Sequence, residues 1–334
     1  RTALLSANPK VDGLLGTAPS VAGIPILVNL PAFGIVMFIT WLLLRGARES
    51  STANNVMVVI KLLALGLFVG VGFVSIDGAN YEPFAPNGFT GVHQGAAIVF
   101  FAYIGFDAIS TAAEETKNPQ RNLPIGILGG LAVCTLIYVI VGAVLTGMVP
   151  YQQLAVADPL AHALQLAGYS RVGWVVALGA AVSMTAVLLV FQYGQPRIFF
   201  SMARDGLLPQ WAARVHPKTR VPFTTTILTG VIVACAALVG DAAETYDLTN
   251  IGTLFAFAIV CAGVLVLRVV EPERSRPFKV PLVWVVAPLG IAACVFIMVG
   301  LRYQAWERFA GWLAIGLLIY FVYGVRHSRL RGRT

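Results

Sequence analysis

The sequence predicts an all-α membrane protein, folded as a bundle of membrane-spanning helices. Hydrophobic residues make up 58% of the 334 positions and charged residues only 11%, with a mean hydropathy of +0.81. Soluble domains carry about 25% charged residues. The apolar residues come in runs of about 18 to 25, each long enough for a helix to cross roughly 30 Å of hydrocarbon. The sequence lacks the alternating segments of about ten residues that mark a membrane barrel.

Nine apolar runs predict nine spans, and short polar connections separate them. In chain order, the runs cover residues 24–44, 54–75, 95–113, 123–148, 173–195, 223–240, 248–267, 282–301 and 309–325. The second run is apolar apart from Lys61, and the third contains Gly105 and Asp107. The fifth mixes small and hydroxyl residues around Ser183, and the seventh places Asn250 at depth.

The basic residues predict the orientation of the bundle. If the C-terminus is cytoplasmic, the connections on that side contain most of the 23 basic residues, as the positive-inside rule requires. Residues 1–23 are then an extracellular segment, and residues 326–334 form a cytoplasmic basic tail. A nucleic-acid partner is disfavoured, because the basic residues are scattered over five connections instead of gathering on one face.

The sequence predicts a single transmembrane domain over residues 1–334. It begins with Arg1 and shows no basic-then-apolar signal peptide. With nine spans and a cytoplasmic C-terminus, the N-terminus lies outside, so we expect further helices upstream. An export signal removed during maturation is the alternative.

The most informative segment is VFFAYIGFDAISTAAEETKNPQRNLP, residues 99–124, because Gly105 and Asp107 interrupt an apolar span near the bilayer midplane. Unwound backbone is tolerated there only against protein or a wet cavity. A half-helix N-terminus attracts a carboxylate and unwound carbonyl groups accept from an ammonium, so a broken helix suits an amino acid zwitterion. Alternatively, Gly105 permits close helix packing, Asp107 caps a half-helix and Phe106 faces lipid or core.

Two interpretations also apply to Lys61. It stands about 9 Å along the helix axis from Asn55 at a rise of about 1.5 Å per residue, so its ammonium group can snorkel to the cytoplasmic interface. The alternative is a functional charge held inside the membrane.

Several stretches of the sequence resemble the cationic amino acid transporter family of the amino acid, polyamine and organocation superfamily. They are ARESSTANNVMVVIK, FFAYIGFDAISTAAEETKNPQRNLPIGI, RIFFSMARDGLLP, NIGTLFAF and RPFKVP, and together they cover nearly the whole chain. On this resemblance, the nine spans match family spans four to twelve of an expected twelve, and the first three are absent. The implied fold has two inverted repeats of five helices, with broken first and sixth helices at the substrate site, followed by two extra helices.

The resemblance implies secondary active transport of L-amino acids across the cell membrane by alternating access, in the form of proton-coupled uptake. Carbonyl groups of Phe101, Ala102 and Ile104 would bind the substrate amine, with Phe106 as an aromatic lid and Asp107 holding the half-helix. Tyr103 and Gly105 are the remaining residues of the substrate-binding segment 101–107 that the resemblance implies. Leu188, near mid-membrane on the fifth span, would shorten the side-chain pocket and favour small substrates. The family name suggests cationic substrates instead, whose side chain needs an acidic or polar pocket end that the absent third span would supply, so the side-chain class stays open.

The resemblance also implies the partners of transport, and two charge clusters at the cytoplasmic ends of the third and fifth spans indicate a gate. Proton-coupled members carry a lysine at the position of Lys61, so Lys61 would couple transport to protons. The expected partners are therefore the amino acid substrate, the proton and membrane lipid. An exchanger of amino acids or a polyamine carrier is the alternative. Glu115 and Arg204 would pair as an inner gate, or else they are solvated anchors at the membrane surface.

Other function classes find no support in the sequence. A membrane enzyme would need a nucleophile with a base, a metal cluster or a cofactor motif, and H-E-x-x-H, G-x-S-x-G and P-loop patterns are absent. No cofactor or metal is therefore expected. The four cysteines lie in separate apolar spans and are interpreted as small buried hydrophobic residues. A channel would show polar rings or a repeated carbonyl filter.

Overall fold

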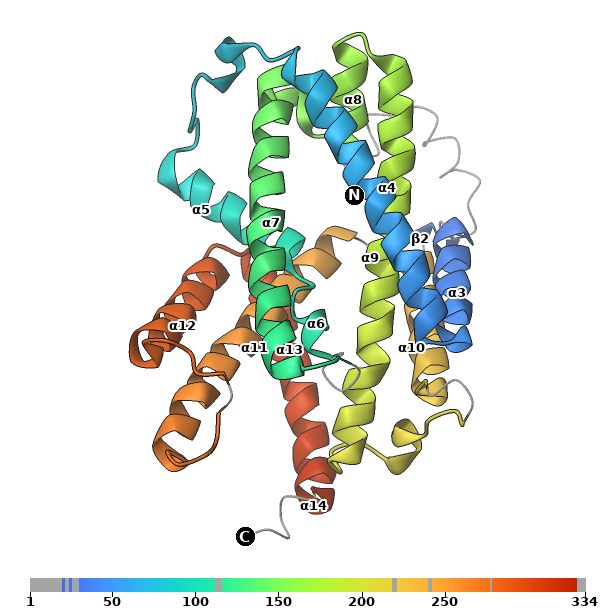
Figure 1. The fold of residues 1–334 in the computed structure, drawn as a ribbon, viewed down its shortest axis with the longest axis vertical. Helices are drawn as coiled ribbons and strands as arrows, with labels where there is room; N and C mark the ends of the chain where they lie inside the picture. Colours follow the sequence, from blue (N-terminus) through green and yellow to red (C-terminus); the bar gives the residue numbers. More distant parts are fainter. Residues whose placement is uncertain are drawn as a thin grey trace.

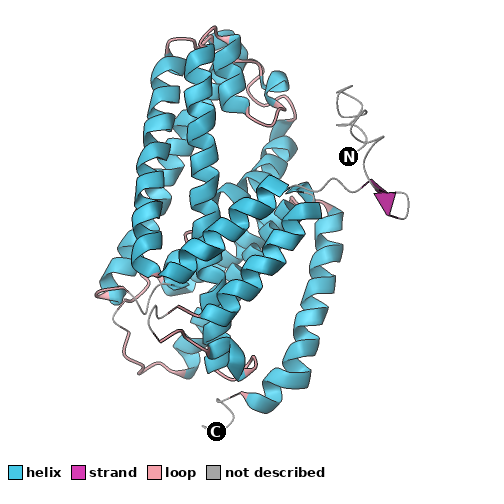
Figure 2. Cartoon of the chain, turned by 90° about the vertical axis from the view of Figure 1, so that its right-hand side faces the viewer, coloured by secondary structure: helices cyan, strands magenta, loops and turns pink. Residues whose placement is uncertain are grey.

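The computed structural model describes residues 20–21, 24–25, 30–111, 116–217, 221–239, 242–276 and 278–328. In these ranges the regular structure is helical, apart from the two-residue strands β1 (Ser20–Val21) and β2 (Ile24–Pro25), which pair antiparallel. Figure 2 shows the helices packed side by side. The all-α prediction is confirmed for this part of the chain.

The helices follow one another along the chain with short connections (Figure 1). They are α3 (Leu30–Arg45), α4 (Ala47–Phe73), α5 (Gly88–Val99), α6 (Ala108–Thr111), α7 (Pro119–Met148), α8 (Pro159–Leu166), α9 (Ser170–Arg204), α10 (Phe223–Val239), α11 (Ala242–Val270), α12 (Val283–Val299), α13 (Tyr303–Ile319) and α14 (Val325–His327). Single turns are η1 (Gly78–Tyr81), η2 (Phe100–Tyr103), η4 (Tyr151–Leu154), η5 (Gln210–Ala213) and the π-helical η6 (Tyr320–Gly324).

Six helical stretches within the described ranges are long and apolar enough to cross a membrane, and three shorter apolar helices accompany them. The long ones cover Ser51–Phe73, Gly88–Thr111, Pro119–Met148, Ser170–Arg204, Thr245–Val270 and Tyr303–His327, and the shorter ones are Leu30–Arg45, Phe223–Leu238 and Val283–Val299. Each predicted span overlaps one of these helices. The protein is therefore a multi-pass membrane protein.

The first predicted span begins too early. Residues 24–25 belong to β2, and α3 begins only at Leu30. Pro31 occupies the first turn of α3, where proline is favoured because its missing amide hydrogen has no helical partner to lose. The hydropathy pattern could not separate apolar strand residues from the apolar helix that follows.

Three clusters of buried apolar side chains join the helices. One connects α4, α7, α8 and α9 around Phe68 and Leu164. A second connects α5 with α11, α12 and α13 around Ala97 and Leu254, and a third connects α3 to α9 around Ile39. In α9, 22% of the most apolar window is buried, against 6% to 11% in the other five long spans. This makes α9 the central helix of the bundle.

Glycines permit the closest helix contacts around α9 and α10. A methyl group added at Gly179 of α9 would collide with Ala64 of α4, and one at Gly230 of α10 would collide with Thr40 of α3. Small residues allow membrane helices to approach closely without a hydrophobic driving force. The α4–α9 contact is antiparallel, because Phe68 packs near Val176 in the same cluster.

The RPFKVP motif has a structural role in the connection between α11 and α12. The guanidinium group of Arg276 donates to the backbone carbonyl oxygens of Leu267, Glu271, Pro272 and Arg274. The last carbonyl groups of a helix lack helical partners, and a cation is stabilised at that end by the helix dipole. Arg276 therefore ends α11 and holds the loop.

Candidate functional site

The third predicted span is broken into two helical pieces. The α5 helix ends at Val99, η2 covers Phe100–Tyr103, and Ile104 has an extended backbone. Gly105 follows with a φ angle of +129°, which residues carrying a Cβ rarely adopt. The short α6 helix then begins at Ala108, and Figure 1 shows α5 and α6 as separate helices.

Asp107 closes the turn that follows the break. Its Oδ1 atom accepts a hydrogen bond from the backbone amide of Gly105 at 3.0 Å, and its backbone carbonyl accepts from the amide of Ser110 at 2.9 Å. The carboxylate therefore accepts from Gly105, two residues before it, instead of from the first amides of α6. This contact stabilises the unusual backbone at Gly105.

The carbonyl groups of the break differ in whether they already accept a hydrogen bond. The Phe101 carbonyl accepts from the Ile104 amide at 3.2 Å, and the Ala102 carbonyl accepts from the Tyr138 hydroxyl at 2.7 Å. Each carbonyl oxygen has two lone pairs, so both retain one. Among the described residues, the Ile104 carbonyl has no hydrogen-bond partner.

Aromatic side chains from neighbouring helices surround the break, and the sequence analysis did not identify them. From α11, Tyr246 contacts Phe101 with ring centroids 4.4 Å apart, and Phe257 contacts Phe106 at 5.1 Å. From α7, the ring of Tyr138 meets that of Tyr103. The Phe106 ring is therefore packed inside the bundle against α11.

Leu188 lines a cavity between α9 and α10. The cavity has a volume of about 340 Å³ and is lined by Leu188, Phe191, Gln192, Gln195, Phe199, Thr229, Ile232 and Val233. None of these side chains is charged. The ring of Phe191 also lies 4.0 Å from the position that a Cβ of Gly105 would take, so one wall of this cavity adjoins the break.

Lys61 is deeper in its helix than the sequence analysis expected. The α4 helix begins at Ala47, and its apolar span covers Ser51–Phe73. At a rise of about 1.5 Å per residue, Lys61 lies ~15 Å from the start of this span and ~18 Å from its end. Lys61 is therefore near the middle of this apolar stretch, and both interpretations of its role stay predictions.

Lys61 faces the central helix. It precedes Ala64 by three residues and Phe68 by seven, a spacing that places all three on one side of α4. Ala64 meets Gly179 of α9, so the antiparallel contact brings Lys61 to the level of Ser183. Lys61 is partly buried, and no hydrogen bond or ion pair of its ammonium group occurs within the described ranges.

The predicted inner gate remains a prediction. Glu115 lies outside the described residues. Arg204 is the last residue of α9, and its guanidinium group lies over the ring of Phe200 at 5.7 Å. No group of three or more metal-ligating side chains occurs among the described residues.

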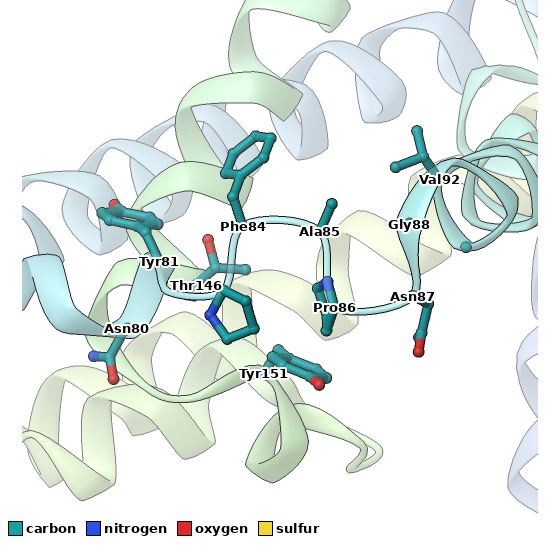
Figure 3. A pocket seen from close by; sticks show the side chains of 12 residues that line it. Asn80, Tyr81, Phe84, Ala85, Pro86, Asn87, Gly88, Val92, Thr146 and Tyr151 are labelled. Atoms are coloured by element: carbon teal, nitrogen blue, oxygen red, sulfur yellow. The ribbon is translucent and has the colours of Figure 1, made fainter.

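A second cavity, of about 390 Å³ (Figure 3), lies toward the end of the molecule opposite α14 (Figure 1). It is formed by the connection from η1 to α5 together with Thr146 and Tyr151, and its lining side chains carry no charge. The connection is fixed to α7, because Asn80 and Tyr81 donate to the carbonyl oxygens of Gly147 and Ala143. This cavity contains no residue of the break.

Comparison with known proteins relates the chain to membrane transporters. A family model described as amino acid permease matches residues 5–322. The branched-chain amino acid permease BcaP of Bacillus subtilis is 46% identical over 318 residues, which cover 95% of this chain and 68% of the relative. A methylthioribose transporter of the same bacterium is 44% identical, covering 98% and 71%. Cationic amino acid transporter 9, chloroplastic, of Arabidopsis thaliana is 39% identical, covering 80% and 48%.

Proposed function

The chain belongs to the amino acid permease family, and from this membership we propose that it transports L-amino acids across the cell membrane by alternating access, driven by protons. It is a multi-pass membrane transporter and not an enzyme. The observation that carries the proposal is the broken helix at Gly105, where the Ile104 carbonyl group has no hydrogen-bond partner in the part of the chain that the structure describes.

The break supplies the partner that a substrate ammonium group needs. Carbonyl oxygens accept hydrogen bonds from an ammonium group, and inside a membrane such unpaired oxygens are costly unless a ligand or water meets them. We assign the amine to the Phe101, Ala102 and Ile104 carbonyl groups. In this proposal Tyr103 and Gly105 set the backbone between these groups, and Phe106 covers the amine.

The side chain of the substrate is proposed to be uncharged and small. The cavity that contains Leu188 has no acidic residue in its lining, and a buried cationic side chain would need one. BcaP is named for branched-chain amino acids, which fits such a cavity. The relative named as a methylthioribose transporter supplies a second candidate, a neutral thioether sugar without an ammonium group.

At the level of the fold, we propose that the chain corresponds to nine of the twelve spans of the inverted-repeat transporter fold, in which two repeats of five helices are followed by two more. Support comes from apolar helices at all nine predicted positions. We further propose one transporter domain over residues 1–334, with residues 1–23 extracellular and the basic tail 326–334 cytoplasmic. Pairing of Glu115 with Arg204 would close the cytoplasmic side.

Proteoliposomes loaded with L-leucine test the function directly. Uptake of labelled L-leucine by counterflow is expected, and an imposed inward proton gradient should raise accumulation further. An exchanger would show counterflow without any response to the gradient, and a polyamine carrier would be inhibited by a polyamine but not by L-isoleucine. Inhibition by methylthioribose and not by L-isoleucine would favour the second candidate.

Two substitutions of Asp107 distinguish support of the backbone from direct binding of the substrate. Asp107→Asn keeps an oxygen that can accept from the Gly105 amide, so its KM for L-leucine should stay within about threefold of the parent value. Asp107→Ala loses this hydrogen bond, which is worth about 1.5–3 kcal/mol when one partner is charged, so KM should rise at least tenfold. Equal losses in both variants would instead indicate direct contact of the carboxylate with the substrate ammonium.

A further inference from the structure

Asn250 of α11 contacts the point at which α5 stops being α-helical. Its Nδ2 atom lies 3.1 Å from the carbonyl oxygen of Ala97 and 3.4 Å from that of Ile98. In an uninterrupted α-helix, these two oxygens would accept the backbone amides of Phe101 and Ala102. Here those residues belong to the η2 turn, and a side chain from another helix takes the place of their amides.

Burial makes an asparagine at this position informative. Asn250 is 1% exposed and lies beside the apolar residues Ile251 and Leu254. Its Oδ1 atom has no hydrogen-bond partner among the described residues. An unpartnered buried oxygen is destabilising, so packing alone would favour an aliphatic side chain. The hydrogen bonds that Nδ2 donates to Ala97 and Ile98 offset the cost of burying the unpartnered Oδ1 atom.

The helix that carries Asn250 is fixed in place on both sides. Asp247, one turn earlier, forms an ion pair with Arg302 at the start of α13, with Oδ2 and Nη2 atoms 2.8 Å apart. Tyr246 packs its ring against Phe101 of the break. The amide donor is therefore presented to α5 from a supported position.

We propose that Asn250 is a positioning residue that determines where α5 breaks and thereby aligns the carbonyl groups of residues 101–104 for the substrate amine. The inference rests on the proposed function, since it gives Asn250 a part in shaping that site. Without the Nδ2 donor, the carbonyl groups of Ala97 and Ile98 regain the amides of Phe101 and Ala102. The helix then extends by about one turn toward Gly105.

Replacement by aspartate gives a test with a pH signature. In Asn250→Asp, an ionised carboxylate cannot donate to the two carbonyl groups, whereas the protonated acid can donate one hydrogen bond. We expect the KM for L-leucine counterflow, relative to the parent protein at the same pH, to be raised about tenfold near pH 7.5 and to recover toward the parent value near pH 5. In Asn250→Leu, the ratio should be raised equally at both values.

Asn80→Asp is the matched control, because Asn80 also donates from Nδ2 to a backbone carbonyl, that of Gly147 at 2.8 Å, but away from the break. Its KM ratio should stay near one at both pH values. Among the described side chains, the titratable and charged groups on α5, α11 and α12, on α13 and at its N-cap are His93, Tyr246, Asp247, Cys261, Arg268, Cys294, Arg302, Tyr303, Glu307 and Arg308. They are the same in the parent and the variants, so their titration cancels in the ratio.

A second measurement is independent of transport. Hydrogen exchange of the amides of residues 100–107 should become slower in Asn250→Leu, because the added helical turn protects them. Unchanged exchange in a folded variant, or a KM ratio of Asn250→Asp that does not depend on pH, would overturn the inference. Failure of the parent protein to catalyse counterflow would instead refute the proposed function, while the exchange result would still decide the role of Asn250 in the break.

Discussion

Replacing Gly105 with alanine is expected to lower the initial rate of L-leucine counterflow at least about tenfold while the protein stays folded. Gly105 has a φ angle of +129°, and a residue with a Cβ held in such a sparsely populated region costs about 1–3 kcal/mol. A difference of 1.4 kcal/mol corresponds to a factor of about ten. Space is not the obstacle, because the nearest atom to an added Cβ is Cζ of Phe191 at 4.0 Å.

The alanine variant can relieve the strain only by changing the backbone of the break, which moves the carbonyl groups that we assign to the substrate. Gly129→Ala is the control, because Gly129 lies inside α7 with nothing within 4 Å of an added Cβ. Alanine is the better helix former there, so counterflow should be unchanged. Parent rates in Gly105→Ala would show that the break does not depend on the glycine conformation.

Part of the site was predictable because its signals are local. Gly105 and Asp107 are two residues apart, and each acts on the backbone of its own segment, through a φ angle of +129° and through a hydrogen bond from one to the other. An apolar run that contains these two residues is unusual enough to indicate a break. The same local signals predict helices at all nine apolar runs, which the described helices overlap.

The residues that the sequence analysis missed act over long distances in the chain. Tyr138 binds the Ala102 carbonyl from 36 residues away, and Asn250 binds that of Ala97 from 153 residues away. Which side of a membrane helix faces a given neighbour depends on how several helices pack together. The sequence showed Asn250 to be a polar residue deep in a span, but it did not show which carbonyl groups Asn250 binds.

Lys61 also lies further from the start of its helix than from the start of the predicted span, for a related reason. The hydropathy pattern registers only the apolar part of α4, whereas the helix extends through polar residues back to Ala47. Helix formation does not end where hydrophobicity ends, since polar residues such as Asn54 are compatible with a helical backbone. Lys61 is near the middle of the apolar stretch Ser51–Phe73, and a charge inside a membrane span is expensive and usually functional.

Replacing Lys61 with glutamine is expected to abolish the response of L-leucine uptake to a proton gradient while counterflow persists. A lysine can release its proton when the transporter opens to the inside, and glutamine has no such proton to exchange. With one proton per substrate, a gradient of one pH unit supplies about 1.36 kcal/mol, which sustains up to about tenfold accumulation. In the variant, the ratio of internal to external L-leucine should fall to about one.

Two further variants separate coupling from the other roles of a lysine. Lys61→Arg keeps the positive charge, but arginine is not deprotonated in proteins, so it should also lose gradient-driven accumulation. Lys117→Gln removes a lysine from the connection after the break and should leave accumulation unchanged. If Lys61 only snorkelled to the interface, arginine would restore what glutamine removes, because arginine snorkels as well. Loss of accumulation in both Lys61 variants therefore requires a proton that leaves, whereas rescue by arginine would assign Lys61 to anchoring of α4.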